Sequence, residues 1–137
     1  MNIEIRVAGL ARGDKEKIEA LVQSDFQGHE FLVCDDKHAD EACKEQILDS
    51  LWAFKASFIA DHARHKLTPA AVKAIEKMQG DLAEDANEIV RALIRDEEAF
   101  VKHAIEADGR GHFLNPYDGE EQEFTFKRKT LFVYRLN

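Results

Sequence analysis

Two segments with alternating apolar residues lie at opposite ends of this 137-residue chain, and they limit the folds that it can adopt. An alternation with a period of two is typical of a half-buried β-strand. Residues 1–7 predict one strand, and residues 124–137 predict either one long strand or two strands joined around Lys127, Arg128 and Lys129. The apolar side of the first segment consists of Met1, Ile3, Ile5 and Val7. In the last segment, Phe124, Phe126, Phe132, Tyr134 and Leu136 share one parity.

The segment between these ends is mainly helical in pattern. A short helix is predicted over 14–26, with Asp14 as its N-cap and apolar residues at helical spacing. Residues 28–36 can form a short middle strand that ends in a turn. We expect the terminal strands to pair with each other or with this middle strand. The apolar positions of the short helix are Ile18, Leu21, Val22 and Phe26.

Two longer helical patterns follow. The first runs from about Asp40 to near Lys66 and has an unusually aromatic face. The second runs from Pro69, with Thr68 as its N-cap, to about Ala107. Its length favours a break or bend at Gly80, with Asp81 capping the second piece, and Gly109 ends the pattern as a left-handed residue. We expect a helical core centred on Leu48, Leu51, Trp52, Phe58, Leu93, Ile94 and Val101.

These patterns together predict one α+β domain over residues 1–137. Long antiparallel helices, packed across the Thr68-Pro69 turn, would accompany a small sheet made by the N- and C-terminal strands. There is no internal repeat and no Gly/Ser linker that would divide the chain. A hydrophobic content of 45% and a charged content of 34% fit a soluble globular protein.

Charge and cysteine content narrow the classes of function. The formal net charge is −8, which argues against direct nucleic-acid binding through a basic surface and permits an acidic face that docks on a basic partner. Cys34 and Cys43 form no CxxC pair and predict reduced thiols. The N-terminal run carries charges, unlike a signal peptide, and no window has the roughly 20 apolar residues of a membrane span. We therefore expect a cytoplasmic protein without a membrane segment; oligomerisation stays open.

Histidines and nucleophiles give no recognisable catalytic motif. His62 and His65 form an HxxH pattern on a predicted helix, but HEXXH and paired Glu-x-x-His motifs are absent. We interpret the two histidines as exposed side chains near a helix C-terminus, where a partial positive charge is favourable. GxSxG, Walker A and GxGxxG motifs are also absent. We expect neither a metal nor a cofactor, and an enzyme is the less favoured class.

Carboxylates recur at intervals of three and four residues in the second long helical pattern, and Arg91 and Arg95 follow them. Such spacing predicts one helical stripe, either a solvated face with weak i, i+4 ion pairs or an interaction surface. The stripe consists of Asp81, Glu84, Asp85 and Glu88.

The tract GRGHFLNPYDGEE, residues 109–121, is the least ordinary part of the chain. Its glycines, Asn115-Pro116 and Asp118-Gly119 suffice to end a helix and reverse the chain, and Gly119 calls for a positive φ. A turn does not need an arginine, a histidine and a tyrosine. We expect an ordered loop with Phe113 and Leu114 turned inward. The exposed polar set, and candidate contact surface, would be Arg110, His112, Asn115, Tyr117 and Asp118.

This tract and the ending FVYRLN resemble the C-terminal segment of small uncharacterised proteins encoded by bacteriophages, prophages and plasmids. In that family a GRGHFL..YDG.E loop leads to an aromatic strand ending YR.N. The resemblance covers Asp108 to Asn137, and less closely the helix before it. Here FTFKRKTL stands where the family has a shorter, more acidic connection. The resemblance implies a mobile-element setting and supplies no established activity and no catalytic residues.

Two functions from different classes follow. In the first, the chain is a small acidic interaction protein of a phage or mobile element that binds and modulates a host protein, with a nucleic-acid-binding defence or regulatory factor as one possible target. In the second, the 109–121 loop binds a small ligand or catalyses a reaction, with His112 as acid or base and Arg110 holding an anion. The net charge and the acidic stripe favour the first.

Overall fold

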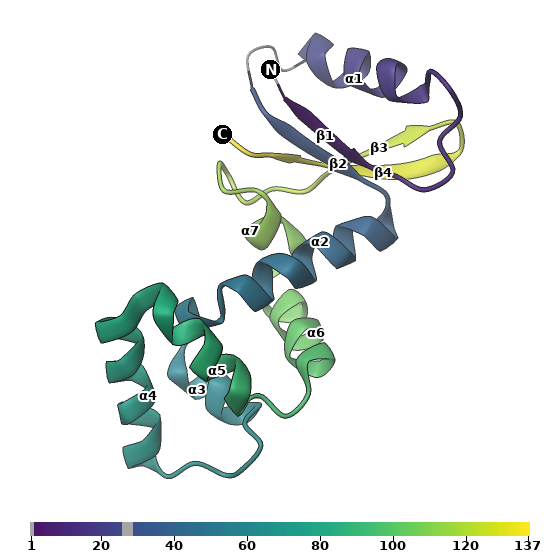
Figure 1. Cartoon of the computed structure of the whole chain (residues 1–137). Helices are drawn as coiled ribbons and strands as arrows, with labels where there is room; N and C mark the ends of the chain where they lie inside the picture. Colours follow the sequence, from purple (N-terminus) through teal and green to yellow (C-terminus); the bar gives the residue numbers. More distant parts are fainter. Residues whose placement is uncertain (1, 26–28) are drawn as a thin grey trace. The chain divides into compact units, whose positions relative to one another are not determined.

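The computed structural model describes residues 2–25 and 29–137 of the chain (Figure 1). The chain divides into two compact units. Unit 1 consists of Met1–Cys43 and Asp108–Asn137, and unit 2 consists of Lys44–Ala107. No helix in the described ranges is long and apolar enough to cross a membrane.

Unit 1 contains a four-stranded sheet in the order β1-β2-β4-β3. β1 and β2 are parallel, and the other two pairs are antiparallel. The predicted α+β class, with N- and C-terminal strands in one sheet, is confirmed. The middle strand is β2, which is buried along its whole length and joins the two ends of the chain. The elements are β1 (Ile3–Arg6), α1 (Asp14–Asp25), β2 (Phe31–Cys34), the start of α2 (Asp36–Asp49), α7 (Arg110–Leu114), β3 (Gln122–Phe126) and β4 (Lys129–Arg135).

The C-terminal segment forms two strands, one of the two predicted alternatives, and their connection decides which side chains share a face. Lys127 and Arg128 have φ of 47° and 68°, as a two-residue type I′ hairpin turn requires. Phe124 consequently lies opposite Leu131, so partners across the hairpin have opposite parity. The shared parity of the aromatic residues therefore does not place them on one face. The side chains of β3 and β4 that pack with α1 are Phe124, Phe126, Leu131 and Val133.

Helix α1 covers one face of the sheet because its apolar stripe is buried there. Ile18 and Val22 are 0% and 5% exposed and belong to the same hydrophobic cluster as Phe31 and Val33 of β2. The predicted inner face of the first strand is confirmed for its described residues, since Ile3, Ile5 and Val7 pack against this cluster. Met1 and Phe26, which were also assigned to apolar faces, lie outside the described residues.

The prediction of Asp14 as N-cap is wrong, because Gly13 precedes the helix and its carbonyl oxygen accepts from the Lys17 amide. Asp14 is the first residue of α1, and its buried carboxylate accepts hydrogen bonds from the Ala11 amide, at 2.9 Å, and the Lys127 ammonium, at 2.6 Å. These contacts tie the start of α1 to the β3–β4 hairpin. The hydrogen bond from Lys127, followed by that from Ala11, lowers the pKa of Asp14.

Unit 2 is helical, but the first long helix predicted from about Asp40 to Lys66 is divided into three segments. Helix α2 ends at Asp49, and the chain extends at Phe54, where ψ is 152°. Gln79 makes this interruption tolerable, because its Nε2 donates to the carbonyl oxygens of Trp52 and Phe54 at 2.9 and 2.6 Å. The elements of unit 2 are the end of α2, η1 (Leu51–Ala53), α3 (Ala56–Asp61), α4 (Pro69–Leu82), η2 (Ala83–Ala86), α5 (Asn87–Leu93) and α6 (Glu97–Asp108).

The second long helix is also divided, and not where the sequence suggested. The N-terminus is as predicted: the Thr68 hydroxyl accepts from the Ala71 amide, and Pro69 is the first helical residue. Gly80 then lies within α4, so a break at Gly80 and a cap at Asp81 are wrong. The break falls at Ala83, whose φ is 49°, and a second falls at Ile94, whose ψ is 128°.

The helical core of unit 2 is confirmed in part. Leu48, Leu51, Ile94 and Val101 are all less than a tenth exposed. Three other residues of the expected core are only partly buried: Trp52, Phe58 and Leu93. The helices that flank the Thr68-Pro69 turn are the short α3 and α4, which pack against each other.

Candidate functional site

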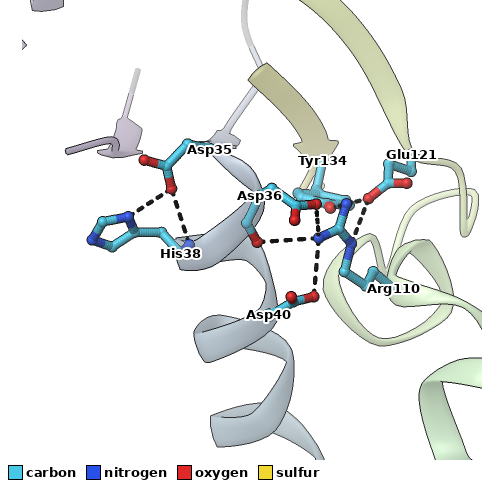
Figure 2. A network of polar contacts seen from close by, with 7 residues as sticks. All are labelled: Asp35, Asp36, His38, Asp40, Arg110, Glu121 and Tyr134. Atoms are coloured by element: carbon cyan, nitrogen blue, oxygen red, sulfur yellow. Dashed lines mark hydrogen bonds and ion pairs between the residues drawn. The ribbon is translucent and has the colours of Figure 1, made fainter. Parts of the chain in front are cut away.

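Arg110, first in the predicted polar set, lies at the centre of an ion-pair cluster within unit 1 (Figure 2). Its side chain is 11% exposed. Its Nη1 donates to the carboxylates of Asp36 and Asp40 at 2.9 and 3.0 Å, and its Nε donates to Glu121 at 2.9 Å. The expectation that Arg110 is an exposed contact residue is therefore wrong. Its guanidinium joins the start of α2 to α7 and to the segment before β3.

The cluster extends onto the sheet. The guanidinium carbon of Arg110 lies 4.6 Å from the centre of the Phe132 ring, and the buried Tyr134 hydroxyl donates to Glu121. Burial lowers the pKa of Arg110, but Tyr134, the Asp36 hydrogen bond and Glu121 outweigh it and raise that pKa overall. Burial, followed by the hydrogen bond to Glu121, raises the pKa of Tyr134. Both groups keep their protons, so neither is suited to proton transfer near neutral pH.

Asn115 is likewise a structural residue. It is 4% exposed, and its Oδ1 accepts from the amides of Tyr117 and Asp118, both at 3.0 Å. Its Nδ2 donates to the Glu120 carbonyl at 2.9 Å. Both polar atoms of the Asn115 side-chain amide thus form hydrogen bonds within the 115–120 turn. The expectation that Asn115 is exposed is wrong.

The backbone of the tract is more regular than the loop that we expected. Residues 110–114 form the short helix α7, entered through Gly109 at φ 83° and ψ 156°, a region that is essentially open only to glycine. A Cβ at Gly111 would lie 2.3 Å from the Gly119 carbonyl oxygen, so Gly111 permits a close approach of two backbones. Gly119 has the predicted positive φ, 74°. Leu114 is buried and Phe113 is partly buried, as expected.

Three members of the polar set are exposed. His112 makes an edge contact with the Phe113 ring, at 4.9 Å between ring centres. Tyr117 is 55% exposed, and the guanidinium carbon of Arg135 lies 3.4 Å from the centre of its ring. Asp118 accepts a hydrogen bond from the Glu120 amide within the turn. The tract therefore brings together a folded turn and an ion-pair cluster, and His112 remains exposed beside them.

The predicted acidic stripe lies on unit 2, and its four carboxylates are all exposed. The break at Ala83 divides them among three elements, so they do not form one helical stripe: Asp81 is on α4, Glu84 and Asp85 are on η2, and Glu88 is on α5. In the part of the chain that the structure describes, none of these four carboxylates takes part in an ion pair. Arg91, which follows these carboxylates in the sequence, donates to Glu97 at 2.7 Å.

Residues 81–89, here called the acidic segment, are firmly anchored despite their exposed charges. Ala86 is fully buried. The Asn87 side chain accepts from the Trp52 amide at 3.1 Å and donates to the Leu48 carbonyl at 2.8 Å. Two large apolar side chains of the segment face solvent, Leu82 at 42% and Ile89 at 45% exposed. An ordered segment that combines exposed apolar side chains with unpaired carboxylates is a candidate contact surface.

The histidines meet a partner that sequence spacing did not indicate. His62 and His65 do not share a helical face, because α3 ends at Asp61. The His62 ring instead lies between Phe58, Phe100 and His103, and its Nε2 is 3.3 Å from Nδ1 of His103. Burial, followed by the charge of His103, lowers the pKa of His62. Among the described residues, no cluster of three or more His, Cys, Asp or Glu side chains is arranged to hold a metal ion.

The two cysteines are free thiols in buried positions. Cys34 lies on β2 and Cys43 on α2. Burial raises the pKa of each thiol to about 12, which leaves almost no thiolate at neutral pH. Neither is a candidate nucleophile, because the thiolate is the reactive form.

Sequence reasoning missed the partners of Arg110. Asp36 and Asp40 are exposed on the first turns of α2, and Glu121 precedes β3, so the three are separated by up to 85 positions. The one available signal was the arginine inside a tract whose other residues suit a turn. The comparisons add no relative: no family model matches, and no curated protein and no solved structure is significantly similar.

Proposed function

We propose that this chain is a small acidic interaction protein whose acidic segment binds a basic surface of another protein. The observation that carries the proposal is the composition of residues 81–89, which contain four exposed carboxylates and two exposed large apolar side chains, Leu82 and Ile89. A basic partner would gain charge complementarity from the carboxylates and would bury the two apolar side chains. Nucleic acid is a poor fit, because phosphates would face these carboxylates.

The backbone at residues 80 and 83 also supports the assignment of the acidic segment as a binding surface. Gly80 occupies a helical position, where glycine is less favourable than alanine, and Ala83 occupies a positive-φ position, where glycine is more favourable. Both choices work against stability at the border of the segment. Departures of this kind concentrate at functional sites, where stability is not the only constraint.

The setting that we propose is a phage or another mobile element, following the resemblance of residues 108–137 to proteins from such elements. The partner would then be a host protein with a basic surface, and nucleic-acid-binding defence or regulatory factors have such surfaces. The chain would then modulate the host protein by covering its basic surface. The alternative ligand site in the 109–121 tract gains no support, because Arg110 and Asn115 are occupied by contacts within unit 1.

Co-purification from the native host with matched variants tests this function. One variant replaces the four carboxylates by amides: Asp81→Asn, Glu84→Gln, Asp85→Asn and Glu88→Gln. The control neutralises four exposed carboxylates elsewhere and changes the net charge equally: Glu16→Gln, Glu41→Gln, Glu106→Gln and Glu123→Gln.

We expect a partner that the wild type and the control retain, and that the variant of the acidic segment loses. Raising the salt concentration should weaken the complex, because exposed charge pairs are screened. A partner bound equally by both neutralised variants would refute the assignment of the acidic segment, and loss from both would show that only net charge matters.

A further inference from the structure

A groove of about 620 Å³ lies on unit 2, beside the acidic segment. One wall is formed by η1 and the start of α3, and the other by α4, which pack against each other within this unit. The residues that line it are Trp52, Ala53, Phe54, Lys55, Ala56, Ser57, Val72, Glu76, Gln79 and Gly80.

The groove offers apolar side chains, and two of the backbone carbonyl groups that line it are already hydrogen-bonded. Trp52 and Phe54 are both partly exposed there. Their carbonyl oxygens, released by the break between η1 and α3, are already bonded to the Gln79 amide. An occupant would therefore be recognised mainly by contact with the aromatic rings and Val72.

Gly80 keeps the α4 wall open. Its φ is not positive, and a Cβ built on it would meet no atom within 4 Å outside its neighbours, so the fold does not require glycine at this position. Within a helix glycine is also among the least favourable residues. The consequence of glycine here is that the wall carries no side chain where it borders the groove.

Negative charge borders the groove. Glu76 lines it together with one cation, Lys55, and η2, which carries Glu84 and Asp85, packs against both η1 and α4. Counted with the two carboxylates of η2, the anions outnumber the single lysine of the lining. These carboxylates are exposed. An occupant with apolar groups alone would have no charge that complements these carboxylates, whereas an occupant with flanking cations would be electrostatically complementary to them.

We propose that the groove receives a large apolar side chain from a basic polypeptide segment, whose lysines and arginines lie against the carboxylates of the acidic segment. This inference rests on the proposed function and adds to it the form of the partner. A polypeptide fits better than a small molecule, because it can contact both the groove and the exposed Leu82 and Ile89, which do not line the groove. The apolar side chain is the anchor, and the cations set orientation and association rate.

Tryptophan fluorescence can test the groove directly, because Trp52 lines it and is the single tryptophan of the chain. The probe is a synthetic, tryptophan-free peptide with lysines and arginines on one helical face and leucines at i, i+3, i+4 and i+7. A second peptide has the same charge and alanines in place of the leucines. We expect the first to change the emission of Trp52 and the second to bind more weakly without that change.

Two leucine substitutions on α4 separate filling of the groove from general effects. Gly80→Leu adds a side chain at a residue that lines the groove, and Ala74→Leu adds the same side chain at an exposed position of α4 that does not line it. We expect Gly80→Leu to weaken the affinity for the leucine peptide by about tenfold or more, as loss of a main anchor does. The Ala74→Leu variant should bind this peptide with the affinity of the wild type. Circular dichroism checks that each variant is folded, and Gly80→Ala provides a smaller filling change.

The four-amide variant of the acidic segment makes failure of the two proposals distinguishable. If Gly80→Leu binds like the wild type while the four-amide variant loses binding, the groove assignment is overturned and the acidic contact surface survives. If the four-amide variant and its matched control bind the leucine peptide equally, charge recognition by the segment is overturned as well. Equal binding of the leucine and alanine peptides would also overturn the anchor.

Discussion

Replacing Arg110 by alanine should destabilise unit 1, although the sequence placed this arginine in an exposed contact surface. The substitution removes a guanidinium that is 11% exposed and contacts three carboxylates and the Phe132 ring. Loss of the ring contact should cost about 1 kcal/mol. The contacts with Asp36 and Asp40 should contribute less than a buried pair would, because these side chains are 76% and 58% exposed and regain water.

Loss of the contact with Glu121 should make the largest single contribution to the destabilisation by Arg110→Ala. Glu121 is 32% exposed and also accepts the Tyr134 hydroxyl, so removal of Arg110 leaves a less solvated carboxylate without its cation. Together these losses amount to about 2–4 kcal/mol in the free energy of unfolding. Arg110→Lys keeps the charge but not the planar fork of donors, so we expect a loss of about half that size.

Urea denaturation followed by circular dichroism measures this effect. Arg12→Ala is the matched control, because Arg12 is exposed, and it should change stability by no more than about 0.5 kcal/mol. An Arg110→Ala variant that is as stable as Arg12→Ala would refute the structural role of the cluster. It would return Arg110 to the set of candidate contact residues.

Three further predictions follow from single side chains. His112→Ala, which truncates an exposed ring, should leave the free energy of unfolding within about 0.5 kcal/mol of the wild type, and a larger loss in urea denaturation would contradict its exposure. Ala83→Gly should stabilise the chain by about 1 kcal/mol, because it relieves a φ of 49°; an unchanged melting temperature would argue against that strain. Burial and then the charge of His103 lower the pKa of His62 from 6.5, while the charge of Arg95 also lowers it and those of Asp61 and Asp96 raise it. The neutral His62 ring is therefore favoured in the folded state, and its contribution to stability should be complete above pH 6.5 and lost as pH falls through the lower folded-state pKa. His62→Gln should remove this step from a pH series of unfolding free energies, and an identical series in the variant would exclude His62 as its source.

Elements whose stability depends on local pattern were predictable from the sequence. The alternation at 3, 5 and 7 follows from burial of one side of a strand, and the Thr68-Pro69 start follows from local capping chemistry. Gly119 could be assigned a positive φ from its Asp-Gly dipeptide. In each case the energetic cause lies within a few residues, so one sequence contains it.

The candidate site was less predictable, because its contacts join distant segments. Nothing near Arg110 indicates that Asp36 and Asp40 will meet it from the start of α2. The pairing of His62 with His103 is of the same kind. The exposed carboxylates of the acidic segment could be recognised by their composition, whereas the exposure of Leu82 and Ile89 depends on tertiary packing.

The position of the break in the second helical pattern shows where propensity fails for a physical reason. Helix propensity favours interruption at Gly80, yet the chain is helical there and leaves the helix at Ala83. Asn87 fixes this geometry, since its side chain bonds to the backbone at Leu48 and Trp52 and holds the following segment against η1. These two contacts outweigh the cost, about 1–2 kcal/mol, of a positive φ at an alanine. Placing alanine at 80 and glycine at 83 would remove both the glycine inside the helix and the positive φ at an alanine. It would also place a methyl group at a residue that lines the groove. Because stability alone would favour this interchange, we expect that glycine at position 80 serves binding in the groove.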